Sequence, residues 1–316
     1  MTNEQLKSIY FGALWFDETK DGYLQAFQFS QPQMDYFEKA DTFWFERSSA
    51  STSKTLEFTT RAEHFSFEYK IIWEGSPDSV ELYVDGLCTD IRYIKDLPKN
   101  GSLSFEMPQG EKSVVFYLPA DATMLIKDFE IDGDVTPAEK KGKLLWLGDS
   151  ITQGFGPLRT SETYVSIVNR TLNYEVLNLG IGAYKYDANS LMKMGDYMPD
   201  AIIVALGTNQ YGDEDMSIIE DYYVRLREIY PETIPVLCIS PVWRGDNREG
   251  IPVLMAFCEK VKQIASACPN TVIIDGMKLV PHLSDYYLDD LHPNILGCET
   301  YGANLLREME KIGFLK

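Results

Sequence analysis

Three short runs of residues, far apart in the chain, combine side chains that could carry out chemistry. They are Gly148-Asp149-Ser150, Gly207-Thr208-Asn209 and Asp289-Asp290-Leu291-His292. A serine hydroxyl attacks a carbonyl carbon when a histidine removes its proton, an acid orients that histidine, and amide groups stabilise the oxyanion that forms. The three runs supply each of these groups. They therefore predict acyl transfer through a serine, as in the hydrolysis of an ester.

The chain has only three histidines, and their surroundings predict different roles. His64 lies in a pattern typical of a β-strand, and His282 lies in an irregular stretch. His292 lies between a pair of carboxylates and the start of a predicted helix at 296–312. Because an imidazole titrates near neutral pH, it suits the task of a general base. We therefore expect His292 to activate the serine.

The elements around these runs predict how the side chains come together. From residue 143 onward, apolar runs typical of buried strands alternate with helical patterns. The expected strands are 143–147, 176–179, 201–206, 234–239 and 271–275, and the expected helices are about 161–172, 187–196, 216–230, 251–267 and 296–312. This alternation predicts a parallel sheet sandwiched by helices. Ligands bind such a sheet at the carboxyl ends of its strands, where Ser150 and Asn209 lie.

The first part of the chain has a different pattern. Residues 1 to about 135 contain short apolar or alternating runs separated by turn signals such as Asp85-Gly86. The expected strands include 43–45, 56–59, 65–69, 80–84, 113–117 and 124–126. This spacing predicts an all-β sandwich, jelly-roll-like. The polar segment 132–142 contains proline and glycine and is the predicted linker, so we expect domains at 1–135 and 136–316.

The longer run from Leu147 to Gly154, LGDSITQG, resembles the first block of SGNH-type (GDSL) esterases. The resemblance covers roughly residues 143–312 and implies that Ser150 is the nucleophile. Asn178-Leu179-Gly180-Ile181-Gly182-Ala183 resembles the second block, which implies Gly182, or alternatively Ala183, as an amide donor to the oxyanion hole beside the N–H of Ser150. Gly207-Thr208-Asn209 resembles the third block and implies that the Asn209 side chain is another donor.

The last run resembles the fifth block of the same family, Asp-x-x-His. The resemblance implies that Asp289, rather than the competing Asp290, orients His292, because glycine usually fills the position of Asp290. The two-domain order resembles carbohydrate esterases in which a jelly-roll domain precedes an SGNH domain. This implies a three-layer α/β/α hydrolase that needs no cofactor and cleaves small acyl esters, acetyl esters of carbohydrates first among them.

Two kinds of alternative stay open at this stage. The same chemistry could act on a lysophospholipid, a thioester or a simple aryl ester. A protein of another class, a non-catalytic glycan-binding protein, could keep the same fold. Three aromatic residues that follow strands at the predicted edge, Tyr184, Tyr211 and Trp243, could contact the substrate, although packing explains each of them almost as well.

Composition excludes several other function classes. The net charge of −19 disfavours partners that are polyanions, such as nucleic acid or an anionic membrane surface. We expect no metal site, because no second histidine or cysteine lies close in sequence to Asp289 and His292. The N-terminus has no signal-peptide pattern, no apolar run reaches transmembrane length, and five cysteines show no framework spacing. These features predict a cytoplasmic enzyme acting on a small-molecule or oligosaccharide ester, with its oligomeric state open.

Overall fold

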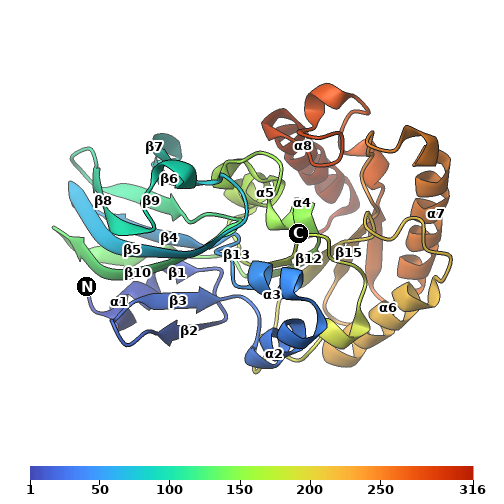
Figure 1. Cartoon of the computed structure of the whole chain (residues 1–316), viewed down its shortest axis with the longest axis horizontal. Coiled ribbons are helices and arrows are strands. Elements are labelled where there is room, and N and C mark those ends of the chain that lie inside the picture. The colour runs from blue at the N-terminus through green and yellow to red at the C-terminus, as the bar shows by residue number, and fades with distance from the viewer. Residues whose placement is uncertain (316) are drawn as a thin grey trace.

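The structure, a computed structural model, describes residues 1–315 as a domain of two antiparallel sheets followed by a domain built on a parallel sheet (Figure 1). In the first sheet the strand order is β1-β4-β9-β6-β7, with β11 beside β4, and in the second it is β2-β3-β10-β5-β8. The strand bounds are β1 Tyr10–Phe11, β2 Trp15–Glu18, β3 Leu24–Phe27, β4 Thr55–Thr60, β5 His64–Glu74, β6 Ser79–Val84, β7 Leu87–Tyr93, β8 Asn100–Glu106, β9 Lys112–Tyr117, β10 Ala122–Ile131 and β11 Val135–Pro137.

The two antiparallel sheets enclose an aromatic core. Phe58 and Phe116 of the first sheet meet Phe65, Phe67 and Phe129 of the second, and all five rings are buried. The ring centroids of Phe67 and Phe116 are 5.3 Å apart in an edge-to-face arrangement, which suits the charge distribution of aromatic rings. The strands expected at 56–59, 65–69, 80–84, 113–117 and 124–126 lie within β4, β5, β6, β9 and β10.

The prediction of a strand at 43–45 is wrong, because these residues belong to a helix. The first domain contains α1 (Asn3–Ser8), α2 (Gln31–Ala40) and α3 (Thr42–Ser48). Asp41 caps α3, since its Oδ1 accepts the N–H of Phe43 at 2.8 Å. A short apolar run fits either a strand or one helical turn, so periodicity does not separate the two.

The second domain has five parallel strands in the order β13-β12-β14-β15-β16. Alternate residues of β12 face opposite helical layers: Leu145 and Leu147 pack with α6 and α7, whereas Leu144 and Trp146 pack with α5 and α8. The bounds are β12 Lys143–Gly148, β13 Glu175–Gly180, β14 Ala201–Ala205, β15 Val236–Ile239, β16 Thr271–Ile274, α4 Ser150–Gln153, α5 Tyr164–Leu172, α6 Ser217–Ile229, α7 Ile251–Ala267 and α8 Ile295–Ile312.

Short 3₁₀ turns connect several of these elements: η1 Ile94–Asp96, η2 Thr160–Glu162, η3 Ala188–Ser190, η4 Arg248–Gly250, η5 Gly276–Lys278 and η6 Ser284–Tyr286. The helices expected at 161–172, 216–230, 251–267 and 296–312 correspond to η2 with α5, α6, α7 and α8. None of the helices in residues 1–315 is long and apolar enough to cross a membrane.

The prediction of a helix at 187–196 is wrong, since the only helical element in this segment is η3. Helix α2 of the first domain packs beside it instead. Gln33 Nε2 donates to the carbonyl of Ser190 at 3.0 Å, and the side chains of Met34 and Phe37 are buried in the core that contains α6 and α7. The first domain therefore supplies a helix to one layer of the second domain.

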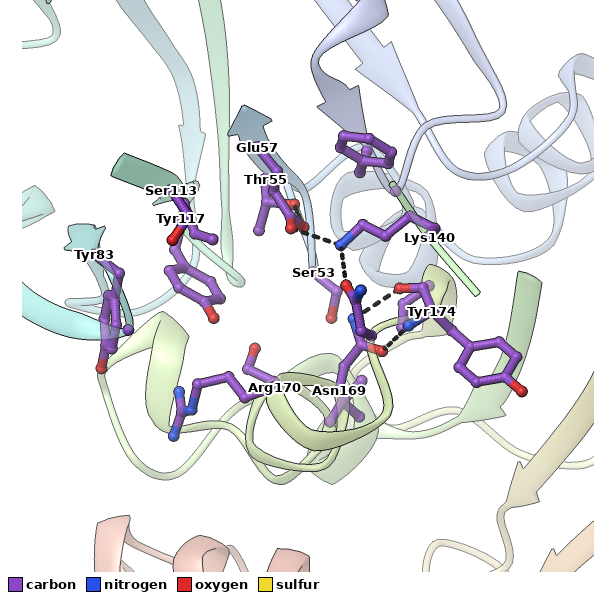
Figure 2. A pocket seen from close by; sticks show the side chains of 18 residues that line it. Ser53, Thr55, Glu57, Tyr83, Ser113, Tyr117, Lys140, Asn169, Arg170 and Tyr174 are labelled. Atoms are coloured by element: carbon purple, nitrogen blue, oxygen red, sulfur yellow. Dashed lines mark hydrogen bonds and ion pairs between the residues drawn. The ribbon is translucent and has the colours of Figure 1, made fainter. Parts of the chain in front are cut away.

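The connection between the domains is short and closely held. Because β11 pairs with β4, the regular structure of the first domain extends to Pro137. Only five residues, 138–142, then separate it from β12. Lys140 in this connection forms an ion pair of 2.6 Å with Glu57 of β4. Figure 2 shows this pair on one wall of a cavity of about 230 Å³ that both domains line, with Arg170 of α5 on another wall. The two domains therefore contact each other directly beside this connection.

Candidate active site

Ser150 stands at the carboxyl end of the second strand of the parallel sheet. It begins α4 directly after β12, and Asp149 caps this helix by accepting the N–H of Ile151 at 3.0 Å. The turn needs glycine at position 148, because a Cβ there would lie 2.1 Å from Thr152 Oγ1. This sharp exit from the strand leaves the hydroxyl of Ser150 at the edge of the sheet.

His292 joins Ser150 to Asp289. Its Nε2 lies 2.9 Å from Ser150 Oγ, and its Nδ1 lies 2.8 Å from Asp289 Oδ2. Because the carboxylate only accepts, the proton of the neutral ring lies on Nδ1, and Nε2 is free to accept the proton of Ser150. The ring of Phe155 packs edge-to-face against the imidazole, with 4.6 Å between the two ring centroids. This arrangement can remove a proton from the serine.

Asp289 also binds the backbone of its own loop. Its Oδ1 accepts the N–H of His292 at 2.8 Å and that of Leu291 at 3.1 Å. Partial burial acts to raise the pKa of Asp289, but the hydrogen bonds from the backbone and ring of His292 outweigh it and lower the pKa below its usual value. The carboxylate is therefore ionised at neutral pH and can stabilise a protonated imidazole.

Asp290 points elsewhere. Its backbone is left-handed, with a φ of 62°, and its carbonyl accepts the N–H of Gly245 at 2.6 Å. Its Oδ1 is buried and has no hydrogen-bond partner in residues 1–315. Of the two adjacent carboxylates, Asp289 is thus the one that contacts His292.

The other two histidines lie in different places. His64 of β5 is half-buried, and its Nε2 is 2.8 Å from Ser104 Oγ in the first domain. His282 is exposed, with its Nε2 2.8 Å from the carbonyl of Met277. Within the described residues, His292 is the histidine that contacts Ser150.

The loop after β13 offers a free backbone donor at Ala183. The N–H of Gly182 is already used, since it donates to Gln153 Oε1 at 2.7 Å. The next residue, Ala183, is exposed and left-handed, with a φ of 57°. Its N–H makes no hydrogen bond to another described residue. Between the two candidate donors, Ala183 has the N–H available for a ligand.

Asn209 lies in the turn after β14. Its Nδ2 donates to the carbonyl of Tyr184 at 2.9 Å, and because a primary amide has two N–H groups, a second donor remains. Arg244 fixes the same turn, since its Nη1 donates to the carbonyl of Thr208 at 2.7 Å. The Asn209 amide is therefore held by the loop after β13 and keeps a free N–H.

The three candidate pocket aromatics lie at different depths. Tyr184 is 5% exposed and its hydroxyl bonds to Ser190, and Trp243 is 5% exposed within the core beneath α5 and α8. Tyr211 is half-buried, and its hydroxyl accepts the Nδ2 of Asn247 at 2.7 Å. Packing accounts for the rings of Tyr184 and Trp243, so only Tyr211 has a ring that a substrate could touch.

Several residues near the site have no place in the sequence predictions. Phe155 packs on His292, and Gln153 binds Gly182. From the first domain, Asp121 binds Gln153, and Arg47 covers Gly182. The run around Ser150 contains Gln153 and could have suggested it, but no local pattern links Asp121 or Arg47 to the site. Within residues 1–315, no three His, Cys, Asp or Glu side chains converge as ligands of a metal would.

Comparison with known proteins agrees with this geometry. Residues 146–299, from the end of β12 into α8, match the GDSL-like lipase/acylhydrolase family. No curated protein sequence matches the chain.

Solved structures resemble the whole chain, including the first domain. The salicylyl-acyltransferase SsfX3 from a tetracycline biosynthetic pathway has a TM-score of 0.75 at 20% identity, over 97% of this chain and 95% of that one. A GDSL-like lipase from Bacteroides ovatus ATCC 8483 has a TM-score of 0.74 at 17% identity, over 97% and 96%. A family two carbohydrate esterase from Clostridium thermocellum, in complex with cellohexaose, has a TM-score of 0.69 at 15% identity, over 96% and 99%.

At these identities the structural similarity shows a shared fold only. The family match indicates the type of reaction, which is the hydrolysis of an acyl ester. The matched segment contains Ser150, Asn209 and His292, and it spans most of the parallel-sheet domain. The second domain accordingly matches the GDSL-like lipase/acylhydrolase family over residues 146–299, and the protein is a carboxylic ester hydrolase.

Proposed function

We propose that the protein is a serine esterase that hydrolyses small acyl esters, and acetyl esters of carbohydrates in particular. The observation that supports this most directly is the continuous contact from Ser150 through His292 to Asp289, with distances of 2.9 and 2.8 Å. Such a chain of contacts turns a weak nucleophile into a strong one without a metal or cofactor.

In the proposed reaction, Ser150 Oγ forms a bond to the acyl carbon while its proton passes to His292 Nε2. Asp289 stabilises the resulting imidazolium through Nδ1–H. The imidazolium then gives its proton to the alcohol that leaves, and an acyl-enzyme remains. Water, deprotonated by His292, attacks the acyl carbon, which releases the acid and restores the hydroxyl of Ser150.

The negative oxygen that forms in each step needs hydrogen-bond donors. We assign this role to the N–H groups of Ser150 and Ala183 and to the Asn209 side chain. The free N–H of Ala183 supports its choice over Gly182, whose N–H already has a partner. Donors that are aimed before the reaction begins are worth several kcal/mol in the transition state.

Carbohydrate as the substrate class is supported by the structural relative that was solved with cellohexaose. The first domain gives further support. In it, the chain passes repeatedly between two stacked antiparallel sheets, from β3 to β6 and again from β8 to β10. We infer that this domain is a jelly roll, the arrangement that the resemblance to carbohydrate esterases implies. We further place the domain boundary in the connection before β12, close to the expected division after residue 135.

The test is acetate release from a panel of acetylated cello- and xylo-oligosaccharides, compared with an aryl acetate, a long-chain lysophospholipid and a thioester. We expect wild-type protein to release acetate from at least one oligosaccharide, and S150A to lose roughly 10³-fold or more of that rate. A serine-reactive phosphonate should label wild-type protein at Ser150 and leave S150A unlabelled.

Other results of these assays would favour the alternative functions. Faster turnover of the lysophospholipid or the thioester would move the substrate class away from carbohydrate. Binding of oligosaccharides without turnover of any ester would favour the non-catalytic glycan-binding protein. S150A with more than a tenth of wild-type turnover would remove Ser150 from the role of nucleophile. Since one structural relative is an acyltransferase, the assay should also include an alcohol acceptor, so that acyl transfer is distinguished from hydrolysis.

A further inference from the structure

The loop that carries Ala183 is tied to the helix that carries Ser150. Gln153, the last residue of α4 and one turn after Ser150, accepts the N–H of Gly182 on its Oε1 at 2.7 Å. Gln153 is 2% exposed, so no water competes readily for this contact. The position of Gly182 determines where the next N–H, that of Ala183, is directed.

The first domain determines which way the amide of Gln153 points. Its Nε2 donates to Asp121 Oδ1 at 2.8 Å, and Asp121 lies in the connection between β9 and β10. A carboxylate only accepts and a backbone N–H only donates, so the amide of Gln153 fits between Asp121 and Gly182 in one orientation. In the flipped orientation, Nε2 would meet the N–H of Gly182, donor against donor.

Asp121 is itself rigidly placed. It is 4% exposed, and Asp78 Oδ2 accepts its backbone N–H at 3.2 Å and that of Ala120 at 2.5 Å. Burial raises the pKa of Asp121 to about 6, although the nearby Arg47 guanidinium and the hydrogen bond from Gln153 act against this rise. The group that orients Gln153 is thus a buried carboxylate that is ionised above about pH 6.

Helix α3 of the first domain approaches the same loop from another side. A Cβ on Gly182 would lie 2.8 Å from Arg47 Cδ and 3.2 Å from Phe43 Cε1, so a larger residue would displace these two side chains. The guanidinium of Arg47 stacks on Phe43, with its central carbon 3.3 Å from the ring centroid. The first domain therefore contacts the oxyanion loop through Arg47 and Phe43, and reaches it indirectly through Asp121 and Gln153.

We propose that Asp121 is a positioning residue of the active site, which acts through Gln153 to hold Gly182 so that the N–H of Ala183 faces the oxyanion. This proposal rests on the proposed function, and it makes the first domain a part of the catalytic machinery. It also predicts a specific kinetic signature: because the oxyanion exists only in the transition state, loss of Asp121 lowers kcat and leaves KM nearly unchanged.

The experiment compares four single variants on an acetyl ester, with thermal unfolding as a check of folding. D121A, which removes the acceptor, should lower kcat by roughly tenfold or more with KM within about twofold, since a misplaced donor loses part of its effect. D121N keeps an acceptor oxygen and should retain more than about half of the wild-type kcat. Q153M removes both hydrogen bonds and should match the loss in D121A.

Thr160 provides the matched control. Its Oγ1 donates to the carbonyl of Leu118 at 2.6 Å, so T160V also removes one buried hydrogen bond between the domains. Thr160 has no contact with the loop of Gly182, and T160V should keep the wild-type kcat. A loss of kcat in T160V equal to that in D121A would mean that domain docking in general, and not Asp121, sets the rate, and would overturn the proposal.

The double variant D121A/Q153M gives the decisive readout. If Asp121 acts only through Gln153, the double variant should lose no more kcat than Q153M alone, so the effects are not additive. Additive losses would overturn the proposal. If D121A does not fold, Q153M still tests the link, because a wild-type kcat in Q153M would overturn it. These failures are distinct from a failure of the proposed function, in which S150A would keep its activity.

Discussion

The histidine side and the oxyanion side of the site are built in different ways. On the histidine side, Asp289 and His292 lie three residues apart, and their side chains and backbone bond to each other within one short loop. On the oxyanion side, Gly182 is buried and its N–H is held by Gln153, which in turn is held by Asp121 of the other domain.

This difference predicts two kinds of sensitivity to mutation. The histidine side should depend on one short segment, so that a change outside it has little effect. The oxyanion side should depend on how the two domains dock, because three segments of the chain meet there. Helix α2, which packs into the core of the second domain, and the ion pair between Lys140 and Glu57 hold this docking in place (Figures 1 and 2).

The largest effect should come from the histidine side. D289N should lower kcat/KM of the acetyl ester by about 10²- to 10⁴-fold, because an amide in place of the carboxylate favours the wrong tautomer and does not stabilise the imidazolium. D290N is the matched control and should change the rate less than about threefold, since asparagine also tolerates the left-handed backbone at this position. The reverse ranking would assign the acid to Asp290. Equal small losses would mean that neither carboxylate orients His292.

A smaller loss should come from the side-chain donor of the oxyanion hole. N209A should lower kcat by about 10²- to 10³-fold with little change in KM, because this donor acts mainly in the transition state. T208V, a neighbouring change that removes a buried hydroxyl without a partner in the described chain, should leave kcat nearly unchanged. A change confined to KM in N209A would show that Asn209 binds the substrate instead.

The buried carboxylate of the oxyanion side should appear in the pH dependence of stability. The pKa of Asp121 is about 6 in the folded protein, against about 3.9 for an unfolded chain. The folded state therefore holds this proton more tightly, and its ionisation destabilises the fold as pH rises from about 4 to about 6. D121N should then unfold a few degrees above wild type at pH 8 and at the same temperature at pH 4. A difference that grows as the pH falls would contradict this sign.

The smallest effect should come from Ala183. A residue with a side chain pays about 1–2 kcal/mol for a left-handed backbone, and glycine avoids this cost but loses more entropy on folding. A183G should therefore raise the free energy of unfolding in urea by less than about 1 kcal/mol and keep kcat within about twofold, because the N–H remains. A183V, whose branched side chain resists this backbone, should lower kcat. If A183V kept the full rate, the N–H of Ala183 would not be the donor.

Much of the fold could be predicted because its signals are local. The five apolar runs form the five strands of the parallel sheet, and four of the five helices expected in the second domain follow from amphipathic periodicity within short windows. Likewise, Ser150 follows a strand at a glycine, and Asp289 lies three residues before His292. A hydrogen bond between residues that are close in sequence can be predicted from a short motif.

Other features were decided only when distant segments met. The sequence alone does not show that 43–45 is helical, that α2 replaces a helix expected at 187–196, or that Gln153 occupies the N–H of Gly182 and leaves that of Ala183 free. The contacts of α2 with 187–196 and of Gln153 with Gly182 join segments that are far apart in the sequence, and the short run at 43–45 has no periodicity that separates a strand from a helical turn. The proposed nucleophile, base and acid therefore lie in short runs that the sequence shows by itself, whereas the proposed oxyanion donor depends on burial and on donor–acceptor matching, which exist only in the folded structure.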